Sequence, residues 1–194
     1  MNTMILESTE HGEIPVDVYQ KLANERILFL SNHIDDSTAT DIVATMLLKD
    51  AEDSTSKITL FINSEGGDIR NALMIYDIMT MISSPIETVC IGAAMDEAAI
   101  ILAAGTPGMR FATKNSTIAV SQLSHNWAMF SDLTDAKKVL DQSASDNKRM
   151  MEIFAKSTGK TMKMIAADFD RRIFMNPVQA LKYGIIDKVI SSSK

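Results

Sequence analysis

The residues of this chain that are best placed to do chemistry are two neighbouring carboxylates, Asp96 and Glu97. They lie within VCIGAAMDEAAIILAAG, residues 89–105, where β-branched residues give way to Gly92, two alanines and a helix-forming run. Small residues let a side chain stand at a strand-to-helix corner beside unpaired helix N–H groups, as at turns that present a nucleophile. Carboxylates are not the usual nucleophiles of acyl transfer, although they serve as general acids and bases. The pattern therefore predicts a nucleophile-type corner that carries the wrong side chains for acyl transfer.

A serine and a histidine further along the chain are poorly spaced to act together. Ser121 and His125 are four residues apart in a segment expected to be partly extended. On one strand they would face the same way, with Cβ atoms roughly 13 Å apart. The three histidines, which include His11 and His33, are far apart in the sequence and belong to no motif with metal-ligand spacing. We therefore expect no metal site, and we disfavour a catalytic pair formed by Ser121 and His125.

Composition limits the classes of protein to which the chain can belong. The 194 residues carry a net charge of −6, with lysine and arginine scattered along the chain, which argues against nucleic-acid binding. No apolar run approaches the roughly 20 residues that a membrane span needs. The first residues, MNTMILESTEHGE, have no basic and apolar regions of a secretory signal. A single cysteine, Cys90, allows no intrachain disulfide, so we expect a cytoplasmic protein that contacts no membrane.

Strand and helix signals alternate along the chain. The expected strands are residues 25–32, 57–64, 87–93, one or two within 108–123, 173–176 and 185–190. The expected helices are residues 35–53, 68–84, 96–105, about 134–157, about 161–170 and 176–184. Repeated βαβ units with apolar strands predict an α/β fold with a mainly parallel sheet. No linker or repeat interrupts residues 1–194, so we expect one domain.

The long helix expected at about 134–157 differs from the others because it is only weakly apolar. Such a helix is expected to project from the domain and to pack on something else. This favours an oligomer. The chain then finishes in a polar tail, residues 191–194.

Several motifs in a fixed order resemble the proteolytic subunit of the Clp protease, the ClpP family. They are INSEGGDI, IYDIM, CIGAAMDEAAIILAAGTPGMRFATKNSTIAVSQ and FMNPVQALKYGIIDKVI, preceded by HGEIPVDVYQKLANERILFL. The resemblance covers nearly the whole chain, with a local length change around 124–133. It implies a crotonase-like α/β fold in stacked heptameric rings, which enclose a chamber fed by an AAA+ ATPase. It also implies that residues 1–16 form an axial segment and that the helix at about 134–157 is the projecting handle.

The resemblance implies acyl transfer by a Ser-His-Asp triad, but all three positions are changed. The nucleophile's position, after CIGAAM, holds Asp96. The base's position, within NSTIAVSQ, holds Ser121, and the orienting acid's position, just before IFM, holds Arg172. Since serine attack needs a proton acceptor that is itself oriented, we expect no competent catalytic residue and no cofactor.

The oxyanion site implied by the resemblance is altered as well. Gly67 matches the family's glycine N–H donor, and Glu97 stands at the position of the second backbone donor. Asp96 adds a negative charge at a helix N-terminus, which favours the helix and opposes a second anion such as a tetrahedral intermediate. We therefore expect this oxyanion-like site to be occupied from within.

The two charged residues at the ends of the former triad are expected to meet. With the small Ser121 between them, the Arg172 guanidinium can cross the gap to Asp96, and the pair would satisfy a carboxylate that is costly to bury alone. Pairing of Arg172 with Glu97 is a second arrangement. Two separately solvated charges are a third.

Two departures bear on the binding of extended peptides. The family's glycine-rich segment reads LSHNWAMFS here, residues 123–131, with a bulky Trp127 and no glycine. Glu65 stands where the family has proline. Both changes argue against peptide binding in the cleft.

These observations favour a catalytically inactive ClpP-like subunit that forms or completes Clp protease rings and modulates ATP-dependent proteolysis. Its partners would be ClpP-type subunits in a homo- or hetero-oligomeric ring, with an AAA+ ATPase as a possible further partner. One alternative is a crotonase-like enzyme that uses Asp96 or Glu97 as acid or base on an acyl-thioester beside Gly67. Another alternative is a residual serine-type peptidase.

Overall fold

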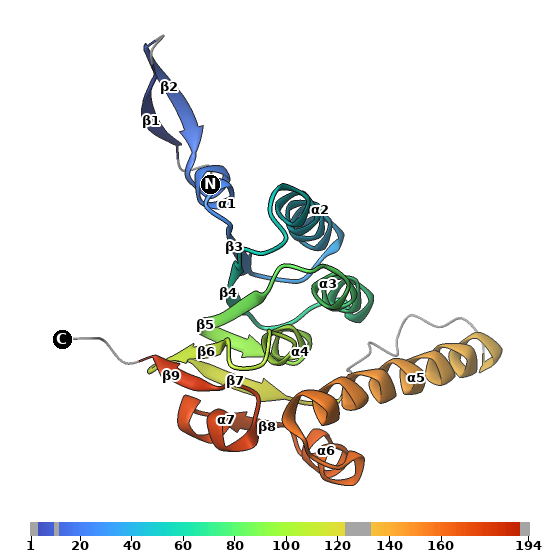
Figure 1. Cartoon of the computed structure of the whole chain (residues 1–194). Helices are drawn as coiled ribbons and strands as arrows, with labels where there is room; N and C mark the ends of the chain where they lie inside the picture. Colours follow the sequence, from blue (N-terminus) through green and yellow to red (C-terminus); the bar gives the residue numbers. More distant parts are fainter. Residues whose placement is uncertain (1–3, 10–11, 123–132, 191–194) are drawn as a thin grey trace.

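The computed structural model describes residues 4–9, 12–122 and 133–190, and its main body is built on a seven-stranded sheet (Figure 1). The strands of this sheet are β3 (Ile27–Ser31), β4 (Ile58–Ser64), β5 (Ile86–Met95), β6 (Arg110–Thr113), β7 (Thr117–Val120), β8 (Ile173–Met175) and β9 (Lys188–Ile190). Their order is β3-β4-β5-β6-β9, with β7 beside β5 and β8 beside β7. All pairs between these strands are parallel except β7–β8. The predicted α/β class with a mainly parallel sheet is confirmed.

The described residues also form helices. They are α1 (Val18–Asn24), α2 (Asp36–Glu52), α3 (Ile69–Met81), α4 (Glu97–Ala103), α5 (Leu133–Thr158), α6 (Met162–Phe169) and α7 (Pro177–Tyr183). α2, α3 and α4 lie on the same side of the sheet, and α5 runs away from the body of the molecule (Figure 1). No helix within the described ranges has the length and apolar character needed to cross a membrane.

The central helix α4 is apolar on all sides because it is enclosed by other elements. All seven of its residues are buried, and it contacts α3, β5 and α5. The C-terminal half of α5 packs on the same core through Met150, Ile153 and Phe154. The Phe154 ring meets Phe169 of α6 edge to face, with centroids 5.3 Å apart. The position of α4 therefore fixes the position of the residues that precede it.

α5 has two unlike halves. No residue between 135 and 145 is buried, whereas Asp146 and several apolar residues after it are. The helix begins and ends within one residue of the expected range of about 134–157. Its role as a handle between subunits remains a prediction.

Three local features differ from the sequence-based expectations. β5 continues to Met95, two residues beyond the expected end at 93. α3 stops at Met81 rather than at 84, because the N–H groups of Ser83 and Ser84 donate to the Asp50 carboxylate at 3.1 and 2.8 Å. Two N-terminal strands and a helix were not expected.

These N-terminal strands, β1 (Met4–Thr9) and β2 (Gly12–Asp17), pair antiparallel and extend away from the main body (Figure 1). α1 follows directly, and the Asp17 side chain accepts hydrogen bonds from the N–H groups of Tyr19 and Gln20. This N-cap fixes the point at which the strand becomes a helix.

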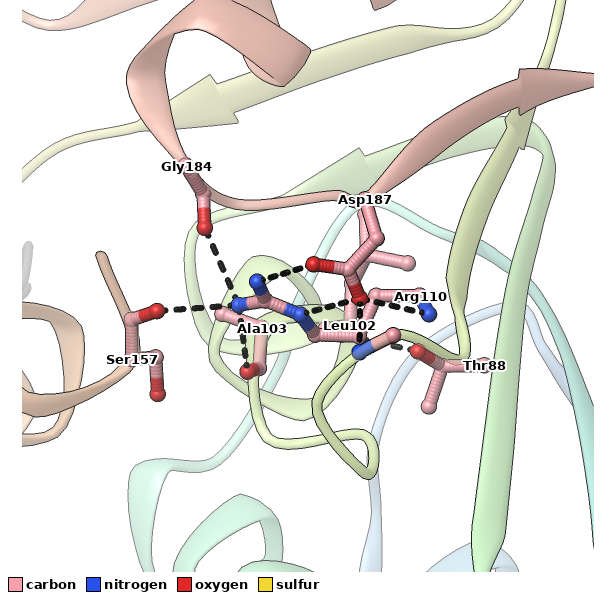
Figure 2. A network of polar contacts seen from close by, with 8 residues as sticks. Thr88, Leu102, Ala103, Arg110, Ser157, Gly184 and Asp187 are labelled. Carbon is pink, nitrogen blue, oxygen red and sulfur yellow. Dashed lines mark hydrogen bonds and ion pairs between the residues drawn. The ribbon is translucent and has the colours of Figure 1, made fainter.

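The Arg110 guanidinium joins the ends of three helices to the last strand (Figure 2). It binds both carboxylate oxygens of Asp187, with Nε to Oδ2 at 2.9 Å and Nη2 to Oδ1 at 2.6 Å. Nη1 donates to the carbonyl oxygens of Ala103, Ser157 and Gly184, at the C-terminal ends of α4, α5 and α7. A cation at these ends satisfies carbonyls that have no partner within their own helices.

The network also holds the Asp187 carboxylate in its charged form. Burial alone would raise the pKa of Asp187. This effect is outweighed by the hydrogen bonds and positive charge of Arg110 and by the hydrogen bond from the Gly108 N–H, so the pKa of the Asp187 carboxyl lies below its ordinary value of 3.8. The stabilisation is therefore present above the ordinary pKa and is lost as the pH falls through the lowered one.

Removing this carboxylate tests its contribution to the fold. We expect Asp187→Ala to lower the free energy of unfolding by about 3–5 kcal/mol, because a largely buried guanidinium loses its partner. Urea unfolding near neutral pH measures the change. Glu152→Ala is the matched control, since it breaks an exposed ion pair with Lys148 and should have little effect. Equal losses in both variants would contradict the assignment.

Candidate functional site

The register of three strands brings Asp96, Ser121 and Arg172 together. β5 and β7 run parallel with Met95 beside Ala119, and the Asp96 N–H donates to the Ala119 carbonyl at 2.9 Å. β7 and β8 run antiparallel with Val120 opposite Ile173. Ser121 and Arg172 each lie one residue beyond that last pair. Residues 76 positions apart in the sequence therefore share one end of the sheet.

β5 reaches this position because it changes partners along its length. Its middle pairs with β6, while Ala93 to Met95 pair with β7. At the change, the Asn63 side chain accepts a hydrogen bond from the Ala93 N–H at 3.1 Å. A Cβ at Gly92 would lie 2.3 Å from that Asn63 oxygen. Glycine therefore leaves room for the Asn63 amide where the strand shifts its register.

Asp96 itself occupies a backbone conformation that L-residues rarely adopt. Its φ is 50° and its ψ is −110°, between the last residue of β5 and the first of α4. Such a conformation costs of order 1–3 kcal/mol and is typical of the sharp strand-to-helix turn that presents a nucleophile. The side chain makes no cap hydrogen bond to α4. The corner is thus built as at a catalytic centre, with a carboxylate in place of a hydroxyl.

The Asp96 carboxylate is held by two side chains. The Ser121 hydroxyl donates to Oδ1 at 2.7 Å, and Arg172 Nη2 donates to Oδ2 at 3.3 Å. The Asp96 side chain is 18% exposed and that of Arg172 is 54% exposed. The Arg172 guanidinium also lies over the Phe174 ring, 5.4 Å from its centroid. The carboxylate is thus largely shielded, while the cation remains half in solvent.

The Glu97 side chain turns in another direction, towards the glycine pair. Its Oε2 accepts a hydrogen bond from the Gly67 N–H at 3.1 Å, and the residue is only 8% exposed. Arg172 therefore contacts Asp96 and not Glu97. We expected the oxyanion-like site to be occupied from within, and the structure shows the Glu97 carboxyl accepting the Gly67 N–H.

The Gly66-Gly67 turn is fixed by a second segment. The Ile34 N–H donates to Gly66 O at 3.0 Å, and the Asp68 N–H donates to Ile34 O at 2.9 Å. Gly66 has a φ of +104°, and a Cβ at Gly67 would lie 2.4 Å from Ile34 O. Both positions therefore require glycine.

The environment of Glu97 favours its protonated form. Burial raises the pKa of this carboxyl, and the neighbouring Asp96 charge adds to the effect. Hydrogen bonds from the N–H groups of Gly67 and of Glu97 itself act in the opposite direction, as does His33, but do not cancel it.

Sequence reasoning assigned the Glu97 backbone N–H to the oxyanion-like site and considered its side chain as a partner of Arg172 or as an acid or base. The side-chain bond to Gly67 was missed, as was the Phe174 ring beside Arg172. Phe174 could have been found, because residues two apart in an extended segment share a face. His125, Trp127 and the rest of 123–131 lie outside the described residues, so the interpretation of that segment stays a prediction.

The described residues contain no group of three or more His, Cys, Asp or Glu side chains that could hold a metal ion. Cys90 is fully buried in β5, and burial raises the pKa of its thiol. It therefore contributes to packing in this part of the chain.

A comparison with protein-family models matches residues 10–193 to a family described as Clp protease. The match includes the strand-to-helix corner, the glycine turn and the segment that carries Arg172.

The buried carboxyl at position 97 makes stability depend on pH. Because the pKa of Glu97 is raised in the folded state, the folded protein binds the proton of this carboxyl more tightly than the unfolded chain does. The associated stability is present below the ordinary value of 4.5 and is lost as the pH rises through the folded value. We expect Glu97→Gln to be more stable than the natural chain at about pH 8, with the difference vanishing towards about pH 4.

Urea unfolding across this range measures the difference. Glu65→Gln, at an exposed position on the same turn, is the control and should change little. A Glu97→Gln effect that is constant with pH would contradict the assigned cause.

Proposed function

This chain belongs to the Clp protease family, whose members typically form oligomeric rings, and from this premise we propose that it is a subunit without catalytic activity. It forms or completes Clp protease rings and modulates ATP-dependent proteolysis. The observation that carries this proposal is the Asp96 carboxylate at the nucleophile corner, bound to both Ser121 and Arg172.

The chemistry of these three groups supports inactivity. Peptide hydrolysis by a serine needs a base that takes the hydroxyl proton and later gives it to the leaving amine. The Ser121 hydroxyl instead donates to a carboxylate, and that carboxylate is paired with a guanidinium. An arginine side chain stays protonated in proteins, so Arg172 cannot relay this proton. The three side chains satisfy one another rather than a substrate.

The retained framework supports a role in assembly. The glycine turn, the register of β5 and the capped helix α7 are present although the three positions of the triad are changed. In this proposal α5 packs as a handle between subunits, and residues 1–16 form the axial segment. The partners are ClpP-type subunits, in homomeric or mixed rings, and an AAA+ ATPase that delivers substrates. The protein works in the cytoplasm.

One observation favours a second candidate, a residual serine-type peptidase. The Ser121 hydroxyl lies 2.7 Å from Asp96 Oδ1, so a carboxylate is in position to accept its proton. The geometry of Glu97 does not favour the third candidate, an acyl-thioester enzyme. Its carboxyl occupies the Gly67 N–H that a thioester carbonyl would need.

A peptide-turnover assay separates inactivity from residual activity. We expect the purified natural chain to release no fluorophore from short fluorogenic peptides above the rate without protein. Ser121→Ala should be indistinguishable from it, and Arg172→Ala serves as a variant that frees Asp96 without touching the hydroxyl. Turnover that is lost on Ser121→Ala would replace the proposal by the second candidate.

Native mass spectrometry tests the role in assembly. We expect ring-sized complexes, and mixed rings after incubation with an active ClpP-type subunit. Addition of this chain should also change the rate at which the active subunit and its ATPase degrade a folded substrate. A chain that stays monomeric in every mixture and leaves that rate unchanged would refute the assembly role.

A further inference from the structure

We propose that the Glu97 side chain is a second, independent block to peptide hydrolysis, because it occupies the Gly67 N–H that would otherwise hold a substrate's carbonyl oxygen. The inference deepens the proposed function and rests on it. It assigns to Glu97 the blocking of the Gly67 N–H, a role that the three changed triad positions do not have.

The first support is the place of the carboxyl. Glu97 Oε2 accepts the Gly67 N–H at 3.1 Å, and a Cβ built on Gly66 would lie 2.4 Å from the same oxygen. The carboxyl therefore fills the space directly beside the glycine turn. The Glu97 residue is more than nine-tenths buried, which shields the acceptor oxygen from water, while its hydrogen bond with Gly67 is partly buried.

The second support is the cost of displacing the carboxyl. A peptide carbonyl that took the Gly67 N–H would leave a buried oxygen of Glu97 without its donor, and leaving a buried polar group unsatisfied is costly. Substrate would thus have to exchange one hydrogen bond for another and also find room beside the turn. Transition-state stabilisation by this donor is lost in the same way.

The third support is that the two sets of contacts are separate. Asp96 accepts from Ser121 and Arg172, whereas Glu97 accepts from Gly67. Replacing the triad positions therefore leaves the Gly67 N–H occupied. The charges that act on the pKa of Glu97 are those of Asp96, which raises it, and His33, which lowers it. A protonated carboxyl keeps an acceptor oxygen, so the block is present in both forms.

Amide hydrogen exchange on the natural chain tests the occupancy directly. We expect Glu97→Ala to speed exchange at Gly67 by roughly tenfold or more, because its acceptor is removed. Glu97→Gln keeps an acceptor oxygen of similar reach and should leave Gly67 protected. Glu65→Ala, at an exposed position on the same turn, is the matched control.

Two neighbouring amides serve as internal references. The Asp68 N–H donates to Ile34 O, and the Ile34 N–H donates to Gly66 O, so neither depends on Glu97. Unchanged exchange at Gly67 in Glu97→Ala would overturn the proposal. Equal acceleration at Gly67, Asp68 and Ile34 would also overturn it, because it would show general loosening of the turn.

A restored triad tests the consequence for catalysis. The combined changes Asp96→Ser, Ser121→His and Arg172→Asp are made in chains that keep Glu97 or carry Glu97→Ala or Glu97→Gln. We expect hydrolysis of a fluorogenic peptide to be roughly 100-fold faster with Glu97→Ala than with the other two, the scale of one oxyanion donor.

The outcomes also separate this proposal from the proposed function. If the restored chain that keeps Glu97 hydrolyses the peptide as fast as a folded and assembled restored chain with Glu97→Ala, Glu97 blocks nothing and the proposal is overturned. Failure of the proposed function is seen separately, as peptide turnover by the natural chain.

Discussion

The placement of the candidate site depends on one ion pair at the opposite end of α4. Arg110 holds the Asp187 carboxylate with two nitrogens and satisfies carbonyls at the ends of α4, α5 and α7 (Figure 2). These carbonyls carry the partial negative charge of three helices, and a single cation neutralises them together. α4 is only seven residues long and buried throughout. Its fixed C-terminal end therefore determines where its first residues lie.

At the other end of α4, a single sharp turn sends two adjacent carboxyl groups to different partners. Asp96 faces the end of β7 and the segment before β8, whereas Glu97 faces the glycine turn after β4. In a serine peptidase, the base would lie on the side that Asp96 faces, and the oxyanion would bind on the side that Glu97 faces. Here Ser121 and Arg172 contact the first carboxyl, and the Gly67 N–H binds the second. Both carboxyl groups of this turn are therefore held by partners within the described part of the chain.

The outline of the fold could be predicted from the sequence because the signals were local. Apolar strands followed by amphipathic or buried helices, Asn176 and Pro177 at the start of α7 and Gly184 at its end all point to the observed elements. The end of α3 was less accessible, since it depends on Asp50, which lies more than thirty residues away. The extra length of β5 depends likewise on β7, where Ile118 and Ala119 pair with Ala94 and Met95.

The candidate site was predictable to a similar extent. The proximity of Asp96, Ser121 and Arg172 was expected from the resemblance of the surrounding motifs, and strand register is the physical cause. The direction of the Glu97 side chain was not predictable, because it depends on the position of the Gly66-Gly67 turn relative to α4. From the sequence alone, Glu97 could equally have paired with Arg172. Only the three-dimensional arrangement shows that it binds the Gly67 N–H instead.

The left-handed backbone at Asp96 has a consequence for engineering. Its torsion angles are imposed by β5, the Ala119 carbonyl and the buried α4, none of which involves the aspartate side chain. A different residue grafted onto this position would consequently be aimed at the same point in space. New chemistry could thus be introduced here by exchanging side chains alone, on a main chain that already has the required shape.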